Sequence, residues 1–121
     1  MADRDIVVWA EIPVTDLEKS VAFYSKVFGY EMEINNEGPN PMADLGGMQN
    51  KSGAHLYPGK PAPDSGNTVH LALPDSLEDG IARCKNAGGE VVSPPIPLPT
   101  GRFVYARDID GNSIGLFEAS A

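Results

Sequence analysis

The sequence predicts an α+β fold built from two tandem copies of one βαβββ module. Residues 12–32 and residues 71–92 each show an apolar strand, a helix start, an amphipathic helix, a glycine stop and another apolar strand. The two copies begin about 60 residues apart, which is half the chain and is typical of a duplicated module. At 121 residues the chain has room for one ordinary domain, so we expect the function in a cleft shared by both copies.

The first module begins with a strand at residues 6–14 that is apolar enough to be buried. Alternation places Trp9 and Glu11 on one face of this strand. A capping box at residues 15–18, with the threonine as the cap, starts a helix whose apolar residues recur at helical spacing. Gly29 ends this helix, because glycine accepts the left-handed conformation of a helix stop. Further strands are expected at residues 30–35, 42–46 and 53–58.

The second module repeats this order after a linker at residues 59–67, whose prolines and glycines disfavour both helix and strand pairing. Its first strand, residues 68–73, alternates so that His70 faces the cleft. The Asp-x-x-Glu pattern of residues 75–78 starts the second helix, and Gly88 with Gly89 stops it. The remaining expected elements are a strand at 90–93, a stiff extended loop at 94–99, and a hairpin of strands 102–107 and 113–118 around a turn at 108–112.

Composition excludes several classes of function. The net charge of −8 argues against nucleic-acid binding, and it suits either a cationic ligand or simple solubility. No apolar run approaches the roughly 20 residues that span a bilayer, so we expect no membrane association. The first residues lack the pattern of a signal peptide, and the one cysteine, Cys84, fits a reducing compartment. We therefore expect a cytoplasmic protein in which Cys84 is a buried structural thiol.

Two ends of the chain resemble one known superfamily. Residues 14–32, VTDLEKSVAFYSKVFGYEM, and residues 108–118, DIDGNSIGLFE, are similar to the opening and closing segments of the vicinal oxygen chelate superfamily. That superfamily includes glyoxalase I, extradiol dioxygenases, fosfomycin-resistance transferases and bleomycin-resistance proteins. The resemblance covers nearly the whole chain and implies a single domain over residues 1–121, with module one at about 5–58 and module two at about 68–118. It also implies that the sheets curl into an open barrel-like cleft.

The resemblance also implies where a metal would bind. Metal-using members hold one divalent ion through four side chains, and the matching positions here are Trp9, His55, His70 and Gly115. Tryptophan does not coordinate metals and glycine has no side chain, so we expect no cofactor. An alternative set of His55, His70 and Glu11 would give a two-histidine, one-carboxylate site for a divalent metal.

Three functions remain open at this point. The leading one is a glyoxalase-like protein that binds a small molecule, with Glu11 and His70 as candidate catalytic groups of an isomerase or lyase. The second is metal-free sequestration of a drug or metabolite, as in bleomycin-resistance proteins. The third is a metal-dependent lyase or dioxygenase that uses the rebuilt set.

The expected pocket lies on the inner faces of the strands. Glu11 either pairs with Arg102 or Arg107 or lines the cleft, and His55 is expected as an exposed histidine at the end of a strand. The aromatic residues on these faces either contact a ligand or pack the core. A homodimer is expected from the resemblance alone. The candidate pocket residues are Trp9, Glu11, His55, Tyr57, His70, Phe103, Tyr105 and Phe117.

Overall fold

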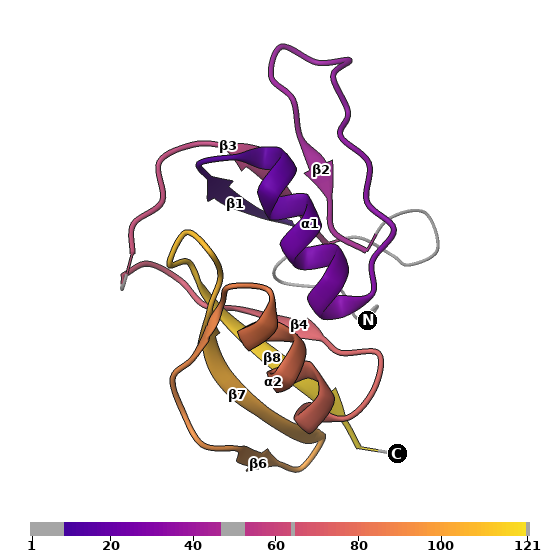
Figure 1. Ribbon diagram of the computed structural model, residues 1–121, viewed down its shortest axis with the longest axis vertical. Coiled ribbons are helices and arrows are strands. Elements are labelled where there is room, and N and C mark those ends of the chain that lie inside the picture. The colour runs from indigo at the N-terminus through magenta and orange to yellow at the C-terminus, as the bar shows by residue number, and fades with distance from the viewer. Residues whose placement is uncertain (1–8, 47–52, 64, 121) are drawn as a thin grey trace, which may run out of the picture.

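The computed structural model describes residues 9–46, 53–63 and 65–120, and residues 6–8 of the expected first strand lie outside this part. Module one forms the upper half of Figure 1 and module two the lower half. The elements in chain order are β1 (Ala10–Val14), α1 (Leu17–Phe28), β2 (Ala43–Asp44), β3 (Ala54–Pro58), β4 (Val69–Ala72), α2 (Leu77–Asn86), β5 (Glu90–Val91), β6 (Ile96–Leu98), β7 (Gly101–Arg107) and β8 (Ser113–Ala119).

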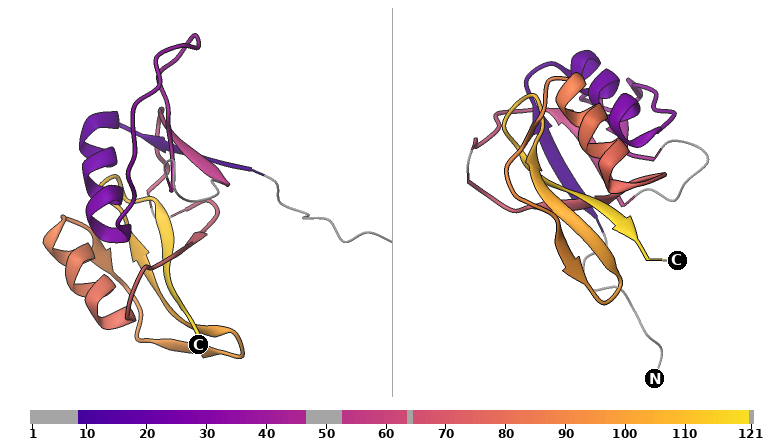
Figure 2. Two further views of the ribbon diagram at one scale, coloured as in Figure 1. Left: turned by 90° about the vertical axis from the view of Figure 1, so that its right-hand side faces the viewer. Right: turned by 60° about the horizontal axis from the view of Figure 1, so that its bottom comes forward.

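The strand pairing confirms the α+β fold and its repeat. One sheet has the order β1-β3-β2, and the other has the order β4-β8-β7-β5 with β6 paired to β7. In each module the first strand pairs in parallel with the last strand, which pairs antiparallel with the strand before it. Both sheets are open, and β1 and β4 are edge strands. Figure 2 shows the two helices together on one side of the molecule and the strands on the other.

Two predicted segments differ from the structure. Residues 30–35 form no strand: isolated bridges fall at Glu31 and at Asn35, and the latter pairs with Met42. Met32 and Ile34 still pack against the core, but β2 has only two residues and offers little backbone for pairing. The expected loop at 94–99 contains β6, which pairs antiparallel with β7, so its proline-rich extended backbone serves as a short edge strand.

In both helices the capping residue lies one position later than the sequence predicts. Asp16, not Thr15, caps α1 by accepting a hydrogen bond from the Lys19 amide at 3.1 Å. Ser76 caps α2 by accepting from the Asp79 amide at 3.1 Å. Asp75, in turn, accepts two hydrogen bonds from Arg83, at 2.7 and 2.8 Å. In both cases the working cap is the side chain directly before the first helical residue.

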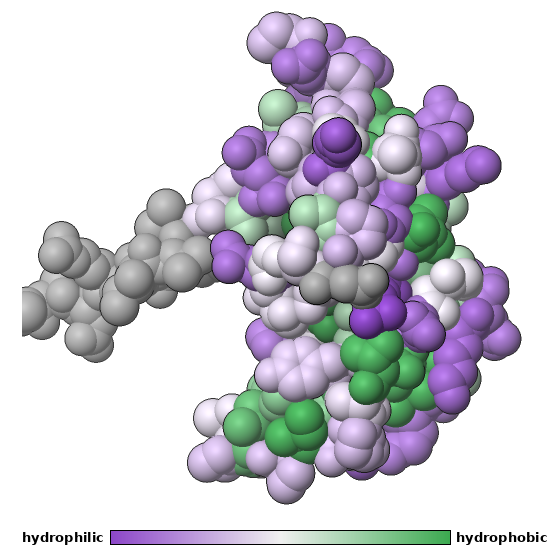
Figure 3. All heavy atoms as spheres, turned by 90° about the vertical axis from the view of Figure 1, so that its left-hand side faces the viewer, coloured by the Kyte–Doolittle hydropathy of each residue, from purple (hydrophilic) through white to green (hydrophobic). Residues whose placement is uncertain are grey.

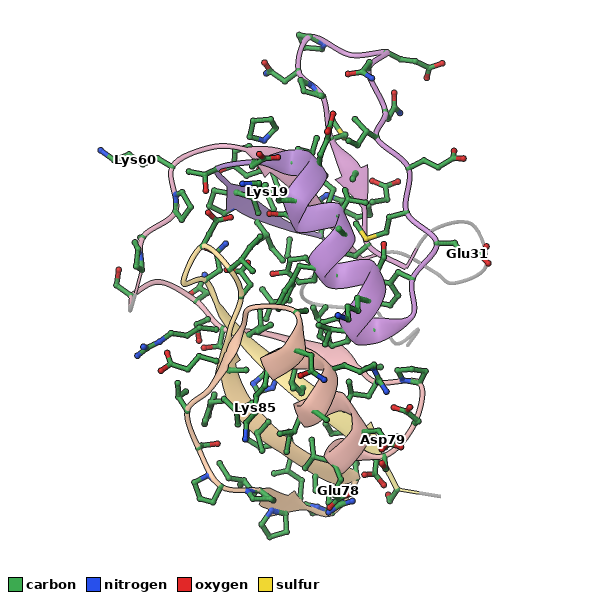
Figure 4. The ribbon with its side chains drawn as sticks, in the orientation of Figure 1. Lys19, Glu31, Lys60, Glu78, Asp79 and Lys85 are labelled. Atoms are coloured by element: carbon green, nitrogen blue, oxygen red, sulfur yellow. The ribbon has the colours of Figure 1, made fainter. Side chains whose placement is uncertain are left out.

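The glycines at the helix ends follow the predicted pattern. Gly29 ends α1 with a φ of 74°, and Gly88 follows the end of α2 with a φ of 97°. Figure 4 shows Glu78 and Asp79 at the start of α2 and Lys85 toward its other end. This arrangement places negative charge near the amino terminus and positive charge near the carboxyl terminus, where each stabilises the helix dipole. No helix of the described residues is long and apolar enough to span a bilayer.

One core joins the helices to both sheets. Helix α1 contributes Leu17, Phe23, Tyr24, Val27 and Phe28, and α2 contributes Leu77 and Cys84. The buried position of Cys84 agrees with its expected role as a structural thiol.

A polar network docks the turn between β7 and β8 onto module one. The Tyr24 hydroxyl, fully buried in α1, donates to Asp108 Oδ2 at 2.6 Å. The Asn112 side chain donates to Asp108 Oδ2 at 2.9 Å and to the Pro13 carbonyl at 2.8 Å. The Asp110 carboxylate accepts hydrogen bonds from the backbone and hydroxyl of Thr15. These contacts fix the two modules relative to each other and so set the width of the space between their edge strands.

Candidate functional site

A cavity of about 850 Å³ lies between the edge strands β1 and β4, under the linker. Of the predicted pocket residues, Trp9, Glu11 and His70 line it. Figure 3 views the molecule from the side on which the linker lies, and shows hydrophobic side chains gathered over module two while module one is mostly polar. The full lining is Trp9, Ala10, Glu11, Ile12, Pro13, Lys60, Ala62, Ser65, Gly66, Asn67, Thr68, Val69, His70, Asn112 and Ser113.

The wall of module one carries three polar side chains in a row, of which the first two are hydrogen-bonded and the last two are in contact. Trp9 Nε1 donates to His55 Nδ1 at 2.8 Å, and His55 Nε2 lies 3.1 Å from Glu11 Oε2. His55 is buried, with 7% of its surface exposed, so the prediction of an exposed histidine at the strand end is wrong. The reason is its place in β3, the central strand of its sheet, where β1 and β2 flank it. The Glu11 side chain remains 66% exposed and faces the cavity.

The alternative pairing of Glu11 with an arginine is also wrong. Arg102 binds Glu78 and Glu118, and Arg107 binds Glu90. Among the described residues, the only ion-pair partner of Glu11 within 4 Å is His55. Lys60 also lines the cavity, but Figure 4 shows its side chain extending from the linker away from the molecule. Within the part of the chain that the structure describes, no lysine or arginine forms an ion pair with Glu11, so its charge faces the cavity.

The wall of module two carries His70, whose ring lies over Gly115. These two residues are partners in the parallel pairing of β4 with β8. A Cβ atom at position 115 would overlap the imidazole of His70, so only glycine leaves room for the ring there. The ring also contacts Phe103 edge-on, with centroids 4.9 Å apart, and lies 5.8 Å from Tyr105. His70 is exposed while Leu71 is buried, as the alternation of this strand predicted.

The strand register shows where Glu11 and His70 lie in their modules. The parallel pair of module one aligns Glu11 with His55, and the parallel pair of module two aligns His70 with Gly115. Glu11 and His70 thus each lie on the first strand of a module, and Trp9 precedes β1. A carboxylate and an imidazole, one from each module, therefore line the same cavity.

The other predicted pocket residues lie outside this cavity. Tyr57 packs edge-on against His55, with ring centroids 6.2 Å apart. Phe103 is buried beside His70, and Phe117 pairs with it across β7 and β8. Tyr105 is 38% exposed and lines a separate cavity of about 250 Å³.

Sequence reasoning missed several polar residues of the cavity. Thr68, Asn112 and Ser113 line it, together with the linker residues Ser65 and Asn67. The Asp-Gly-Asn turn was interpreted only as a tight turn, although an asparagine in such a turn signals a polar group free to bond outside the hairpin. The linker gave no comparable signal, because its composition indicates only irregular backbone.

The residues at the four implied metal positions do not fit a metal ion. Both ring nitrogens of His55 face protein partners, and the space above Gly115 is filled by the His70 ring. The rebuilt set is not assembled either: His55 and Glu11 lie together, whereas His70 packs against aromatic rings of the other module. Within the described residues, no group of three or more His, Cys, Asp or Glu side chains is placed to hold a metal.

Comparisons with known proteins identify the family of the chain. The sequence model of the Glyoxalase/Bleomycin resistance protein/Dioxygenase superfamily matches residues 6–116. "Putative glyoxylase CFP32" of Mycobacterium tuberculosis is 28% identical over 119 residues, which cover 93% of this chain and 45% of that protein. The protein of the same name in Mycobacterium bovis matches equally. This chain therefore spans about half the length of the curated relatives that it matches.

Solved structures share the fold. A hypothetical protein from S. aureus has a TM-score of 0.71 at 22% identity, covering 92% of this chain and 95% of that one. The fosfomycin resistance protein FosX from Listeria monocytogenes has a TM-score of 0.67 at 18% identity, covering 99% and 95% of the two chains. A glyoxalase/bleomycin resistance protein from Albidiferax ferrireducens has a TM-score of 0.70 at 22% identity, covering 96% of this chain and 100% of that one.

Proposed function

The chain belongs to the Glyoxalase/Bleomycin resistance protein/Dioxygenase superfamily, and from this membership we propose that it binds a small organic molecule between β1 and β4 without a divalent metal. The observation that carries the proposal is the cavity of about 850 Å³ with Glu11 on one wall and His70 on the other. This volume is in the range of pockets that enclose small molecules.

The walls of the cavity define what a ligand would meet. Glu11 supplies a hydrogen-bond acceptor with negative charge, and the half-exposed indole of Trp9 lies beside it. His70 supplies an imidazole on the opposite wall, and Asn112 and Thr68 supply neutral polar groups. A molecule with a hydrogen-bond donor or positive charge at one end and a planar body would satisfy these groups.

Acid–base catalysis on a bound carbonyl compound is a second candidate function. The placement of a carboxylate and an imidazole on facing walls favours it, because one ligand can contact both groups. Glu11 would take a proton from carbon next to the carbonyl, and His70 would hold a proton at the carbonyl oxygen. The glyoxylase name of the curated relatives supports the same class of chemistry. Turnover that survives in both Glu11→Gln and His70→Ala would eliminate this candidate.

A thermal-shift screen tests the binding proposal. The library contains small carbonyl compounds, planar aromatic amines and matched neutral and anionic compounds. A ligand at 100 times its dissociation constant stabilises the native state by about 2.7 kcal/mol, which raises the melting temperature measurably. We expect Glu11→Gln and His70→Ala to remove the shift, and Glu18→Gln, on the exposed face of α1, to retain it. Shifts that persist in both cavity variants would place the binding site elsewhere.

We also propose that the chain forms a homodimer, because dimers are common in the superfamily to which it belongs. Light scattering that gives the mass of one chain at micromolar concentration would contradict this proposal.

A further inference from the structure

We propose that Trp9 and His55 are positioning residues for Glu11, and that the row of contacts Trp9–His55–Glu11 takes the place of a metal centre in module one. The inference rests on the proposed function in one respect, namely that Glu11 is the group that meets the ligand. It departs from the metal chemistry that the resemblance implies, because the residues at those positions do not fit an ion.

The first step is the protonation pattern of His55. An indole Nε1–H only donates, so the 2.8 Å contact from Trp9 requires that His55 Nδ1 accepts and carries no proton. The remaining hydrogen of the neutral ring is then on Nε2, the nitrogen that lies 3.1 Å from a Glu11 oxygen. Trp9 thereby selects one tautomer of His55, and in that tautomer the N–H group is the one beside the carboxylate.

The second step is the effect on Glu11. A glutamate on an exposed strand face normally samples several rotamers, and holding it costs side-chain entropy. Here its partner is buried and fixed: His55 is 7% exposed and lies in the central strand of its sheet. The Glu11 backbone is fixed as well, since Glu11 and His55 are register partners. The carboxylate is therefore held by one oxygen at the cavity wall, which leaves its second oxygen for a ligand.

The third step is the exclusion of metal. A histidine binds a divalent ion through a ring nitrogen with a free lone pair, and in this tautomer the lone pair of Nδ1 is used by the indole. Coordination would require the hydrogen bond from Trp9 to His55 to break. Module two offers no compensation, because position 115 has no side chain and the His70 ring fills the space above it.

Nitrogen NMR of the unliganded protein tests this inference directly. The chain has only two histidines and one tryptophan, so long-range ¹H–¹⁵N spectra resolve His55, His70 and the single indole N–H. We expect His55 as a single Nε2–H tautomer, with Nδ1 in the range of an unprotonated acceptor. Trp9→Phe keeps an aromatic ring and removes the donor, and we expect a shift of the His55 signals to a mixture of tautomers. The His70 signals serve as the internal control and should remain in place.

Each outcome decides the inference. A wild-type His55 that is protonated on Nδ1, or a mixture of tautomers, overturns it even if the variant does not fold. Unchanged His55 signals in a folded Trp9→Phe variant also overturn it. Addition of one equivalent of zinc chloride should leave the His55 signals unshifted, and a shift there contradicts the exclusion of metal. Because all spectra are recorded without a ligand, failure of this inference leaves the cavity as a binding site, and failure of the ligand screen leaves the tautomer result intact.

Discussion

Replacing Tyr24 with phenylalanine tests whether the polar network docks the modules. The change removes one hydroxyl whose oxygen lies 2.6 Å from Asp108 Oδ2, and it leaves the ring in place. Tyr24 is fully buried and Asp108 is 4% exposed, so water does not replace the lost bond. A hydrogen bond to a charged group contributes about 1.5–3 kcal/mol, and Asp108 keeps donors from Asp110 and Asn112. We therefore expect Tyr24→Phe to lower the free energy of unfolding by ~2 kcal/mol.

The assay is urea unfolding followed by circular dichroism, with thermal melting as a second measurement. For a chain of this length, ~2 kcal/mol corresponds to a fall in melting temperature of about 6–10 °C. Tyr30→Phe is the matched control, since Tyr30 makes no hydrogen bond with another described residue; its change should remain within about 0.5 kcal/mol. A loss below about 0.5 kcal/mol in Tyr24→Phe would refute the reasoning. Asp108→Ala should cost more, about 4 kcal/mol, and adding Tyr24→Phe to it should cost little further.

Three further results are expected. Gly115→Ala places a methyl group where the His70 ring lies, so we expect it to lower the free energy of unfolding in urea by about 1–3 kcal/mol. Adding His70→Ala should restore most of that loss. A Gly115→Ala variant as stable as the wild type would contradict this packing. Burial, reinforced by nearby Asp108, raises the pKa of the Cys84 thiol to about 11, so a thiol reagent at neutral pH should label Cys84 only after denaturant is added. Burial and Asp108 also raise the pKa of Tyr24 well above its ordinary value. As the pH rises, both groups ionise in the unfolded chain before they ionise in the folded protein. Their contribution to stability is therefore complete below pH 9 and is lost progressively as the pH rises toward and beyond about 11. A urea midpoint that does not fall over this pH range would contradict the expected loss of stability.

The fold was predictable because its signals are local and repeated. Gly29 as a helix stop, the apolar stripe of α1 and the alternation around His70 each depend on residues a few positions apart. The predicted helix caps are one residue too early. Thr15 and Asp16 both have side chains that can cap a helix, but Thr15 instead binds Asp110, which is distant in sequence, and Asp16 caps α1. The apolar alternation of residues 30–35 predicts a strand, but a strand also needs a neighbouring strand with which to pair. β2 has only two residues, which is too short to pair along the whole segment.

The candidate site was predictable only in part. Glu11 and His70 were expected on inner strand faces from alternation, and the cavity brings them to opposite walls. The role of His55 was not predictable, because its burial and its bond to Trp9 depend on which strand lies between β1 and β2. The register that pairs Glu11 with His55 and His70 with Gly115 likewise follows from parallel pairing between strands about 45 residues apart, which no local spacing reveals.

The turn between β7 and β8 has a consequence for synthesis on the ribosome. Its bonds to Tyr24, Thr15 and the Pro13 carbonyl join residues separated by 84, 95 and 99 positions in the chain. Domains generally fold in the order in which they emerge, so module one leaves the ribosome long before its partner turn exists. Until then the Tyr24 hydroxyl and the face of α1 that contacts α2 lack their partners. During synthesis the first module therefore exposes surfaces that α2 and the β7–β8 turn cover in the folded protein. We expect chaperones to bind this intermediate in preference to the folded protein.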